Sequence, residues 1–338
     1  RRAIEKDMVR IPGGTCRVSY LAKPPVFKLG GTCAPVKQYA LAGEALSAVP
    51  GSCLFLVPDG PVRALEVRGP GDLERLNGLP IQVALDRLPE ALLLGGSPET
   101  HEAGNLRILL SPAFSPEDRR LAMDWTEHLA RALEAQLGAA PALTLALVPP
   151  QGPNLLAVSD RSPRVQVAEM NPRSGTGEQA LAEGLALRWL GESPEAALES
   201  LEPGAWLRVG WARLAAHRAL QAIGETWAGE QVLAAAFESR LDVPLERPPG
   251  REDDRFHGYV DSRRIKAPCA VMLLDWEIAR LTGGRKSLRD LWTLACLEGG
   301  DVEKAAVDLA GPGIRTLFDR WIRESNRLLH PFPFLARP

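Results

Sequence analysis

From residue 121 to residue 137 an apolar side chain recurs at every fourth position, in the order Leu121, Trp125, Leu129, Leu133 and Leu137. This spacing puts them on one face of an α-helix and predicts a long amphipathic helix over 116–137. Ser115 is expected to cap its first turn, with Asp118 at the third helical position. Apolar strands are predicted on both sides, at 105–111 and 142–148, followed by shorter ones at 155–158 and 165–168.

From residue 178 onward helical patterns dominate the sequence. Helices are predicted over 178–191, 205–222, 228–239, 266–282, 287–298, 301–309 and 314–327. The polar segment 244–258 is rich in Pro, Arg and Asp and is predicted to be a loop. Gly283 and Gly284 are expected to end one helix in left-handed geometry, and Ser287 to cap the next.

The first hundred residues have a different pattern. Short strands are predicted at 15–20, 52–57 and 62–67, separated by turns rich in Gly and Pro, which is typical of a sandwich-like module. The predicted fold class is therefore α+β, with a β-rich domain at 1–104 and a second domain at 105–338. In the second domain, strands are expected within 105–170 and helices within 178–330. A chain of 338 residues that is 45% hydrophobic is long enough for two cores.

The composition excludes some classes of partner. The formal net charge is −2, so nothing indicates a nucleic-acid partner. No apolar run reaches the roughly 18 residues that a transmembrane helix requires. The first residues are charged and lack the apolar segment of a signal peptide. The compartment stays open between the cytoplasm and, if an upstream signal has been removed, the periplasm or the exterior.

The cysteine and histidine patterns indicate no metal site. The five cysteines form no C-x-x-C pair, and we expect them to be small buried hydrophobes. A disulfide among Cys16, Cys33 and Cys53 is the alternative in an exported protein. His101 and Glu102 begin like a zinc motif, but Asn105 stands where the second histidine would be. That segment is predicted to be an incidental loop.

Residues 181–191 read LAEGLALRWLG and match the spacing of a zinc-peptidase helix, H-E-x-x-H-x-W-x-G. Trp189 and Gly191 occupy the places of the Trp and the Gly. The two ligand histidines fall on Glu183 and Leu187, and the general-base glutamate falls on Gly184. A catalytic zinc site needs three protein ligands, an open position and a carboxylate near the bound water. The pattern therefore predicts the helix without its zinc chemistry.

Three other segments share patterns with one peptidase family. Residues 51–60 are similar to a G-x-S-L-F-L-x-P-E-G strand. Residues 270–288 are similar to an A-L-x-L-D-x-x-I-R-x-x-T-G-G-x-x-S-L-D-D signature, and residues 317–321 to a closing F-F-x-x-Y helix. Together with the degenerate helix, they make the chain resemble the M61 (glycyl aminopeptidase-like) family, which is related to the M1 aminopeptidases. The resemblance implies a β-sandwich-like domain followed by a mainly helical, thermolysin-like (gluzincin-type) peptidase domain.

The family's other active-site contexts carry replaced residues as well. The glutamate that is the third zinc ligand, in a W-L-x-E-G-F context, maps to Val209. The tyrosine that stabilises the oxyanion, in a Y-x-K-G context, maps to Arg264. Under this resemblance the mapped positions are Glu183, Gly184, Leu187, Val209 and Arg264. The mapping implies a pseudopeptidase with no catalytic residue, no metal and no other cofactor.

Three hypotheses about function follow from this mapping. The first is a catalytically inactive peptidase-like protein that binds a protein or peptide partner. The second is a metal-free enzyme in the former cleft, where Glu183 and Arg264 would meet a charged substrate or form a salt bridge with each other. The third is a structural subunit that partners an active homologue.

The second hypothesis requires an open, polar cleft. Arg208, Trp211 and Lys266 are the residues expected to line it. A cleft plugged by Leu187, Val209 and Trp211 would exclude it, because apolar side chains would fill the former metal pocket like a core.

Overall fold

A computed structural model of the chain describes residues 46–50, 92–96, 98–150, 164–173, 178–200, 202, 204–225, 245, 256–297 and 301–323. The strands expected at 15–20, 52–57, 62–67 and 155–158 lie outside the described residues, as do the helix at 228–239 and Cys16, Cys33 and Cys53. In the first hundred residues, β1 (Leu46–Pro50) pairs antiparallel with β2 (Leu92–Gly96).

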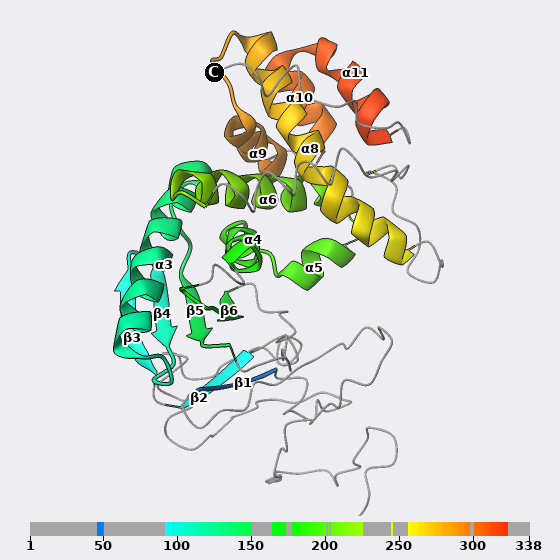
Figure 1. Ribbon diagram of the computed structural model, residues 1–338. Coiled ribbons are helices and arrows are strands. Elements are labelled where there is room, and N and C mark those ends of the chain that lie inside the picture. Colours follow the sequence, from blue (N-terminus) through cyan, green and yellow to red (C-terminus); the bar gives the residue numbers. More distant parts are fainter. Residues whose placement is uncertain are drawn as a thin grey trace, which may run out of the picture.

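A four-stranded mixed sheet lies beside helices α3 and α4 (Figure 1). Its strand order is β3 (Glu99–Ala103), β4 (Leu106–Leu110), β5 (Leu143–Val148) and β6 (Val165–Glu169). Strand β3 is antiparallel to β4, whereas β4, β5 and β6 are parallel. Helix α3 (Pro116–Leu137) connects β4 to β5 and lies along one face of the sheet. The strands expected from 105 to 111, from 142 to 148 and from 165 to 168 are thereby confirmed.

The segment of His101 and Glu102 is a strand, so the loop prediction for it was wrong. A two-residue turn at Gly104 and Asn105 joins β3 to β4, and Gly104 has φ +62°, which suits a glycine at a hairpin turn. The strand was missed because β3 lies at the edge of the sheet and carries mainly exposed, polar side chains, so it has no apolar pattern that indicates a strand. The division at residue 104 stays a prediction, although β3 pairs with β4 across it.

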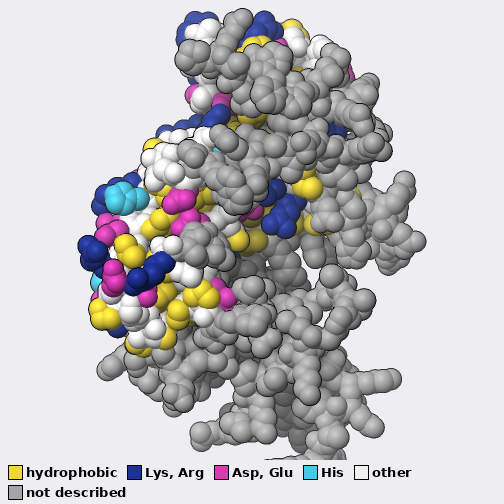
Figure 2. Space-filling model, viewed as in Figure 1, with side chains coloured by type: hydrophobic (Ala, Val, Ile, Leu, Met, Phe, Trp, Pro, Cys, Tyr) yellow, Lys and Arg dark blue, Asp and Glu magenta, His cyan; other side chains and the backbone are white. Residues whose placement is uncertain are grey.

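Helix α3 follows its sequence pattern closely. The Ser115 side chain accepts a hydrogen bond from the Asp118 main-chain N–H at 3.1 Å, which satisfies one donor of the first turn. Leu129 and Leu133 are fully buried in the core that α3 forms with the sheet. The outer face of α3 carries charges of both signs (Figure 2). The predicted amphipathic helix and its cap are both confirmed.

The remaining elements are helical. They are α4 (Glu178–Trp189), α5 (Pro194–Glu199), α6 (Ala205–Ala222), α8 (Phe256–Thr282), α9 (Leu288–Leu297) and α10 (Val302–Ala310). A 3₁₀ turn η2 (Pro312–Ile314), α11 (Arg315–Leu317) and a π-helical turn η3 (Phe318–Arg323) close the described chain. The structure is therefore a helix-rich α+β fold. Among the described helices, none has the length and apolar character needed to cross a membrane.

Helix α6 lies between two cores (Figure 1). One core combines the sheet with α3, α4 and one side of α6. The other combines the opposite side of α6 with α8, α9 and α10. At Gly210 the α6 backbone meets α8 so closely that a Cβ atom would lie 2.5 Å from the Ala267 carbonyl oxygen. The absence of a side chain at this position is what lets the two helices approach.

Three helix predictions need correction. Helix α8 begins at Phe256 rather than at 266, and Pro268 lies inside it. Helix α5 was not predicted. The single helix expected over 314–327 breaks into η2, α11 and η3 within its described part. A proline normally favours a helix start, because it cannot donate to the carbonyl four residues earlier. In α8 a side chain from another helix supplies the missing donor, as described below.

Candidate functional site

The mapped positions lie on three helices that pack on one another. Glu183, Gly184 and Leu187 are on α4, Val209 is on α6 and Arg264 is on α8. Helix α6 contacts both α4 and α8 extensively, so it is the element that relates the three. The structure brings Glu183 and Arg264 together, whereas it directs Leu187 and Val209 into the core.

Glu183 is held by two hydrogen bonds. Its Oε1 atom accepts from Nη2 of Arg213 at 2.7 Å and from Nε2 of Gln179 at 2.9 Å. The Arg213 side chain is 8% exposed and that of Glu183 is 13% exposed, so this is a largely buried ion pair. By contrast, Nη2 of Arg264 lies 4.0 Å from Oε2 of Glu183, which is beyond hydrogen-bonding distance. Arg213, which sequence reasoning missed, is therefore the main partner of Glu183.

Arg213 also compensates for the proline in α8. Pro268 has no N–H group, so the helix cannot supply a donor to the carbonyl of Arg264, four residues earlier. Nη1 of Arg213 donates a hydrogen bond to that carbonyl. One guanidinium thus neutralises Glu183 on α4 and satisfies a main-chain acceptor on α8. The signal in the sequence was the proline inside an apolar helical pattern, which implied a free carbonyl in need of a donor.

Gly184 accommodates a side chain from the sheet. A Cβ atom at this position would lie 2.6 Å from Nε2 of Gln166, on β6. That same Nε2 donates to the Leu181 carbonyl at 3.1 Å, and Gln166 is buried. Gly184 is the position that the resemblance gives to the general-base glutamate. There the Gln166 amide covers α4 and connects it to β6.

Leu187 and Val209 are core residues. Leu187 is 4% exposed and Val209 is fully buried, and both belong to the core that contains the sheet. Apolar side chains at these positions exclude water from the space between α4 and α6. Leu187 and Val209 are therefore part of the packing between α4 and α6.

The residues expected to line a cleft are largely withdrawn from solvent. Trp211 is 4% exposed and packs edge to face on Trp292, with ring centroids 5.2 Å apart. Lys266 is buried. Arg208 forms ion pairs with Glu192 at 2.6 Å and with Glu202 at 2.5 Å. The structure therefore does not bring Arg208, Trp211 and Lys266 together around an open polar surface.

Arg263, which precedes the mapped Arg264 on α8, is fully buried, and its guanidinium binds carbonyl groups at the C-terminal end of α5. Its Nη1 atom donates to the carbonyl of Ser200 at 2.6 Å and to those of Ala197 and Leu198 at 3.2 and 3.3 Å. Its guanidinium also lies 4.6 Å from the centre of the Tyr259 ring. A cation is stabilised at the carbonyl end of a helix, where the dipole is negative. Arg263 thus ties α8 to α5.

Two titratable groups near these helices have displaced pKa values. Burial raises the pKa of the Cys269 thiol to about 12, although the Arg213 charge opposes this, so the thiol is neutral at pH 7. Burial, reinforced by the charge of Glu225, raises the pKa of Glu178 to about 7. Neither group adds a negative charge beside Glu183 at mildly acidic pH.

The residues at the mapped positions do not fit zinc. Among these positions Glu183 alone is a metal-ligating side chain, and its carboxylate already accepts hydrogen bonds from Arg213 and Gln179. Within the described parts of the chain, no three His, Cys, Asp or Glu side chains are grouped so that they could hold a metal ion. What the arrangement can do is bind charged groups electrostatically and tie α4, α6 and α8 together.

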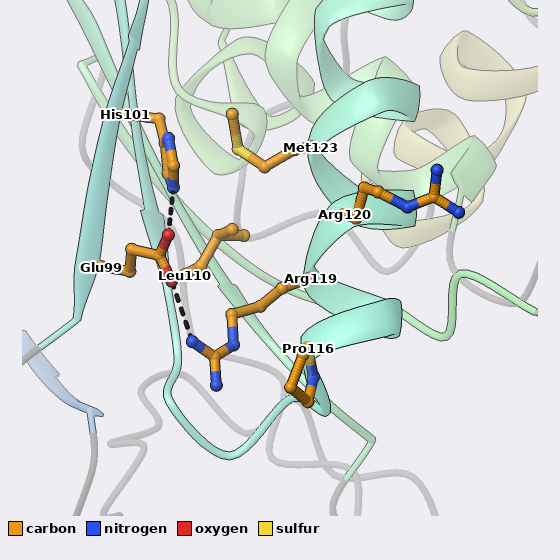
Figure 3. A pocket seen from close by; sticks show the side chains of 7 residues that line it. All are labelled: Glu99, His101, Leu110, Pro116, Arg119, Arg120 and Met123. Atoms are coloured by element: carbon orange, nitrogen blue, oxygen red, sulfur yellow. Dashed lines mark hydrogen bonds and ion pairs between the residues drawn. The ribbon is translucent and has the colours of Figure 1, made fainter.

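A shallow pocket lies elsewhere, between β3 and α3 (Figure 3). Glu99 lies at its centre, with Oε1 2.9 Å from Nε2 of His101 and Oε2 2.9 Å from Nη1 of Arg119. These bonds, that of Arg119 first, hold the pKa of the Glu99 carboxyl below its usual value. The wall is completed by Leu110, Pro116, Arg120 and Met123. The hydrogen bond between Glu99 and Arg119 connects the edge strand β3 to α3.

Comparisons with known proteins yield structural neighbours only. No protein-family model matches the chain, and no curated protein matches it. Native yeast LTA4 hydrolase has a TM-score of 0.49 and 13% identity, over 74% of this chain and 42% of that protein. An aminopeptidase N family protein from Idiomarina loihiensis has a TM-score of 0.49 and 12% identity, over 74% of this chain and 51% of that protein.

Yeast LTA4 hydrolase in complex with bestatin has a TM-score of 0.45 and 10% identity, over 72% of this chain and 42% of that chain. The matches thus span about half or less of the length of these proteins. The neighbours are aminopeptidase-like proteins at low sequence identity.

Proposed function

We propose that this chain is a peptidase-like protein that lacks zinc-peptidase chemistry and binds a protein or peptide partner. The observation that carries the proposal is the arrangement around Glu183. A guanidinium and an amide occupy its Oε1 atom, at 2.7 and 2.9 Å, where the resemblance would place a zinc ligand. A cation on the protein itself thus takes the role of counter-charge.

Apolar packing beside Glu183 supports the same proposal. Leu187 and Val209 lie in the core rather than beside a water-filled cavity. A water molecule positioned for hydrolysis needs a polar space with two or more partners. Gln166 covers the surface of α4 at Gly184, where a general base would stand.

The alternative of a metal-free enzyme has less support. A general base must reach a proton of the substrate, whereas Oε1 of Glu183 already accepts hydrogen bonds from Arg213 and Gln179 and its side chain is 13% exposed. The alternative of a purely structural subunit predicts a large exposed apolar surface. Among the described residues, Trp276 is the large hydrophobic side chain that is exposed, at 44%.

Metal analysis of the purified protein, with a peptidase assay on the same sample with and without added zinc, tests the proposal. We expect substoichiometric zinc and no hydrolysis above the rate without protein. A chelator-treated sample is the control for adventitious metal. One zinc per chain together with chelator-sensitive peptide hydrolysis would contradict the proposal and the mapping of Glu183, Leu187 and Val209.

A further inference from the structure

We infer that Arg264, at the outer side of the junction between α4, α6 and α8, is a recognition point for a carboxylate of the bound partner. The inference rests on the proposed function and names the chemistry by which this surface would recognise a peptide. Three side chains set the local balance of charge. Glu183 carries one negative charge, whereas Arg213 and Arg264 carry one positive charge each.

The two arginines are not equivalent. Arg213 is 8% exposed and is engaged with Glu183 and with the carbonyl of Arg264. Arg264 has a side chain that is 54% exposed, and its guanidinium reaches no closer than 4.0 Å to Glu183. Because Arg213 already neutralises Glu183, the surplus positive charge of the cluster resides on Arg264, which faces solvent.

Among the acidic side chains that the structure describes, no second one cancels this surplus. Within the described residues, Glu183 is the one acidic side chain within 4.0 Å of the Arg264 guanidinium. The buried Cys269 thiol, whose pKa burial raises to about 12, is neutral at pH 7, and Gln179 carries no charge. Among the described residues no acidic side chain other than Glu183 competes for the donors of Arg264, so they can bind an external acceptor.

The position of the Arg264 backbone is fixed as well. Its carbonyl is bound by the largely buried Arg213 guanidinium. Residues 266–271 that follow it are buried, and Ala267, Ala270 and Val271 among them belong to the core shared with α6. A guanidinium on a rigid helix offers a fork of parallel N–H donors that matches the two oxygens of a carboxylate. A carboxylate is thus the group that this surface is best suited to receive, either from a peptide C-terminus or from an acidic side chain.

The test is a titration of the full chain followed by NMR of the arginine side-chain N–H groups. The probes are N-acetyl-trialanine with a free C-terminal carboxylate, the same peptide as its C-terminal amide, and acetyl-Ala-Ala-Glu amide. We expect the free acid to bind about tenfold more tightly than the amide, the size of one charge-assisted hydrogen bond. Tight binding of the Glu peptide as well would extend recognition to acidic side chains, and weak binding of it would restrict recognition to a C-terminus.

Two arginines of the same helix provide the matched variants. Arg264→Met should reduce binding of the acid to the level of the amide. Arg280→Met should leave it unchanged, since Arg280 is also on α8 and its side chain is 53% exposed, but it is paired with Glu277 at 2.6 Å. Glu183→Gln, checked for folding by thermal melting, should strengthen binding of the acid severalfold because it removes the opposing charge.

Equal binding of acid and amide, no saturable binding of the acid, or an Arg264→Met variant that binds like the wild type would overturn the inference. Such a result in a zinc-free, inactive protein would leave the proposed function standing. Stoichiometric zinc with hydrolysis of the probes would instead contradict the proposed function itself, so the two failures are distinguishable.

Discussion

Arg213 donates a hydrogen bond to the main-chain carbonyl of Arg264, the group that Pro268 leaves without a donor inside helix α8. The same guanidinium binds Glu183 at 2.7 Å. Three helices therefore depend on one side chain for both charge balance and main-chain hydrogen bonding. This relationship explains why a 27-residue helix can continue through a proline.

Removal of Arg213 should be costly. We expect Arg213→Met to lower the free energy of unfolding by about 3–5 kcal/mol, because a largely buried carboxylate loses its counter-charge. Pro268→Ala restores an N–H group to α8. Its effect on the free energy of unfolding should therefore be about 1 kcal/mol more stabilising in the Arg213→Met protein than in the wild type. Urea unfolding of the four proteins in this cycle measures the coupling. Equal effects of Pro268→Ala in both backgrounds would show that Arg213 does not compensate for the proline.

Two helical glycines should respond differently to alanine. At Gly210 the new methyl group would meet the main chain at Ala267, which cannot move aside, so Gly210→Ala should cost about 3 kcal/mol. At Gly184 it would meet the end of the Gln166 side chain. The lost hydrogen bond to Leu181 and the gained helix propensity are each about 1 kcal/mol, so Gly184→Ala should be nearly neutral. Urea unfolding of both variants checks this order, and the reverse order would refute the packing of α6 on α8.

Buried Arg263 should contribute more to the free energy of unfolding than partly exposed Arg208. Arg263→Met leaves three carbonyls at the end of α5 without a donor, and we expect it to lower the free energy of unfolding by about 3 kcal/mol. Arg208→Met removes ion pairs that water can replace, with an expected cost below about 1 kcal/mol. Thermal or urea unfolding distinguishes them. Equal costs would mean that Arg263 is not the tie between α8 and α5.

Glu178 should make stability depend on pH. Its pKa is about 7 in the folded protein, because of burial and then Glu225, and near 4.5 as a free side chain. Between these values the folded state holds a proton that the unfolded state has lost. This contribution to stability is therefore complete below about pH 4.5, declines as the pH rises to 7, and is absent above it.

The slope from this one group is at most about 1.4 kcal/mol per pH unit. Glu178→Gln should flatten that decline and be more stable than the wild type at pH 8. Urea unfolding at a series of pH values from 5 to 8 measures the difference. If Glu178→Gln has the same dependence of stability on pH as the wild type, Glu178 is not the group responsible for the decline.

The local features of the chain were predictable from the sequence. The four-residue apolar stripe, Ser115 and Asp118 predicted α3 and its cap, because these signals act within one or two turns of a helix. Gly283 and Gly284 end α8 with positive φ values, as the pair predicted. The strands at 106–110 and 143–148 were equally evident from their apolar runs.

The contacts between distant segments were decided by the tertiary structure. The mapping left open whether Glu183 and Arg264 meet a charged substrate or form a salt bridge with each other. In the structure they lie 4.0 Å apart, and Arg213, on the helix between them, is the closer partner of Glu183 at 2.7 Å. Its guanidinium also lets α8 begin at Phe256 and continue through Pro268, where local rules predict a start near the proline. A sequence specifies its periodicities and caps, because these depend on neighbours along the chain. Which cation neutralises a buried carboxylate, and which donor reaches a free carbonyl, depends on how helices pack in three dimensions.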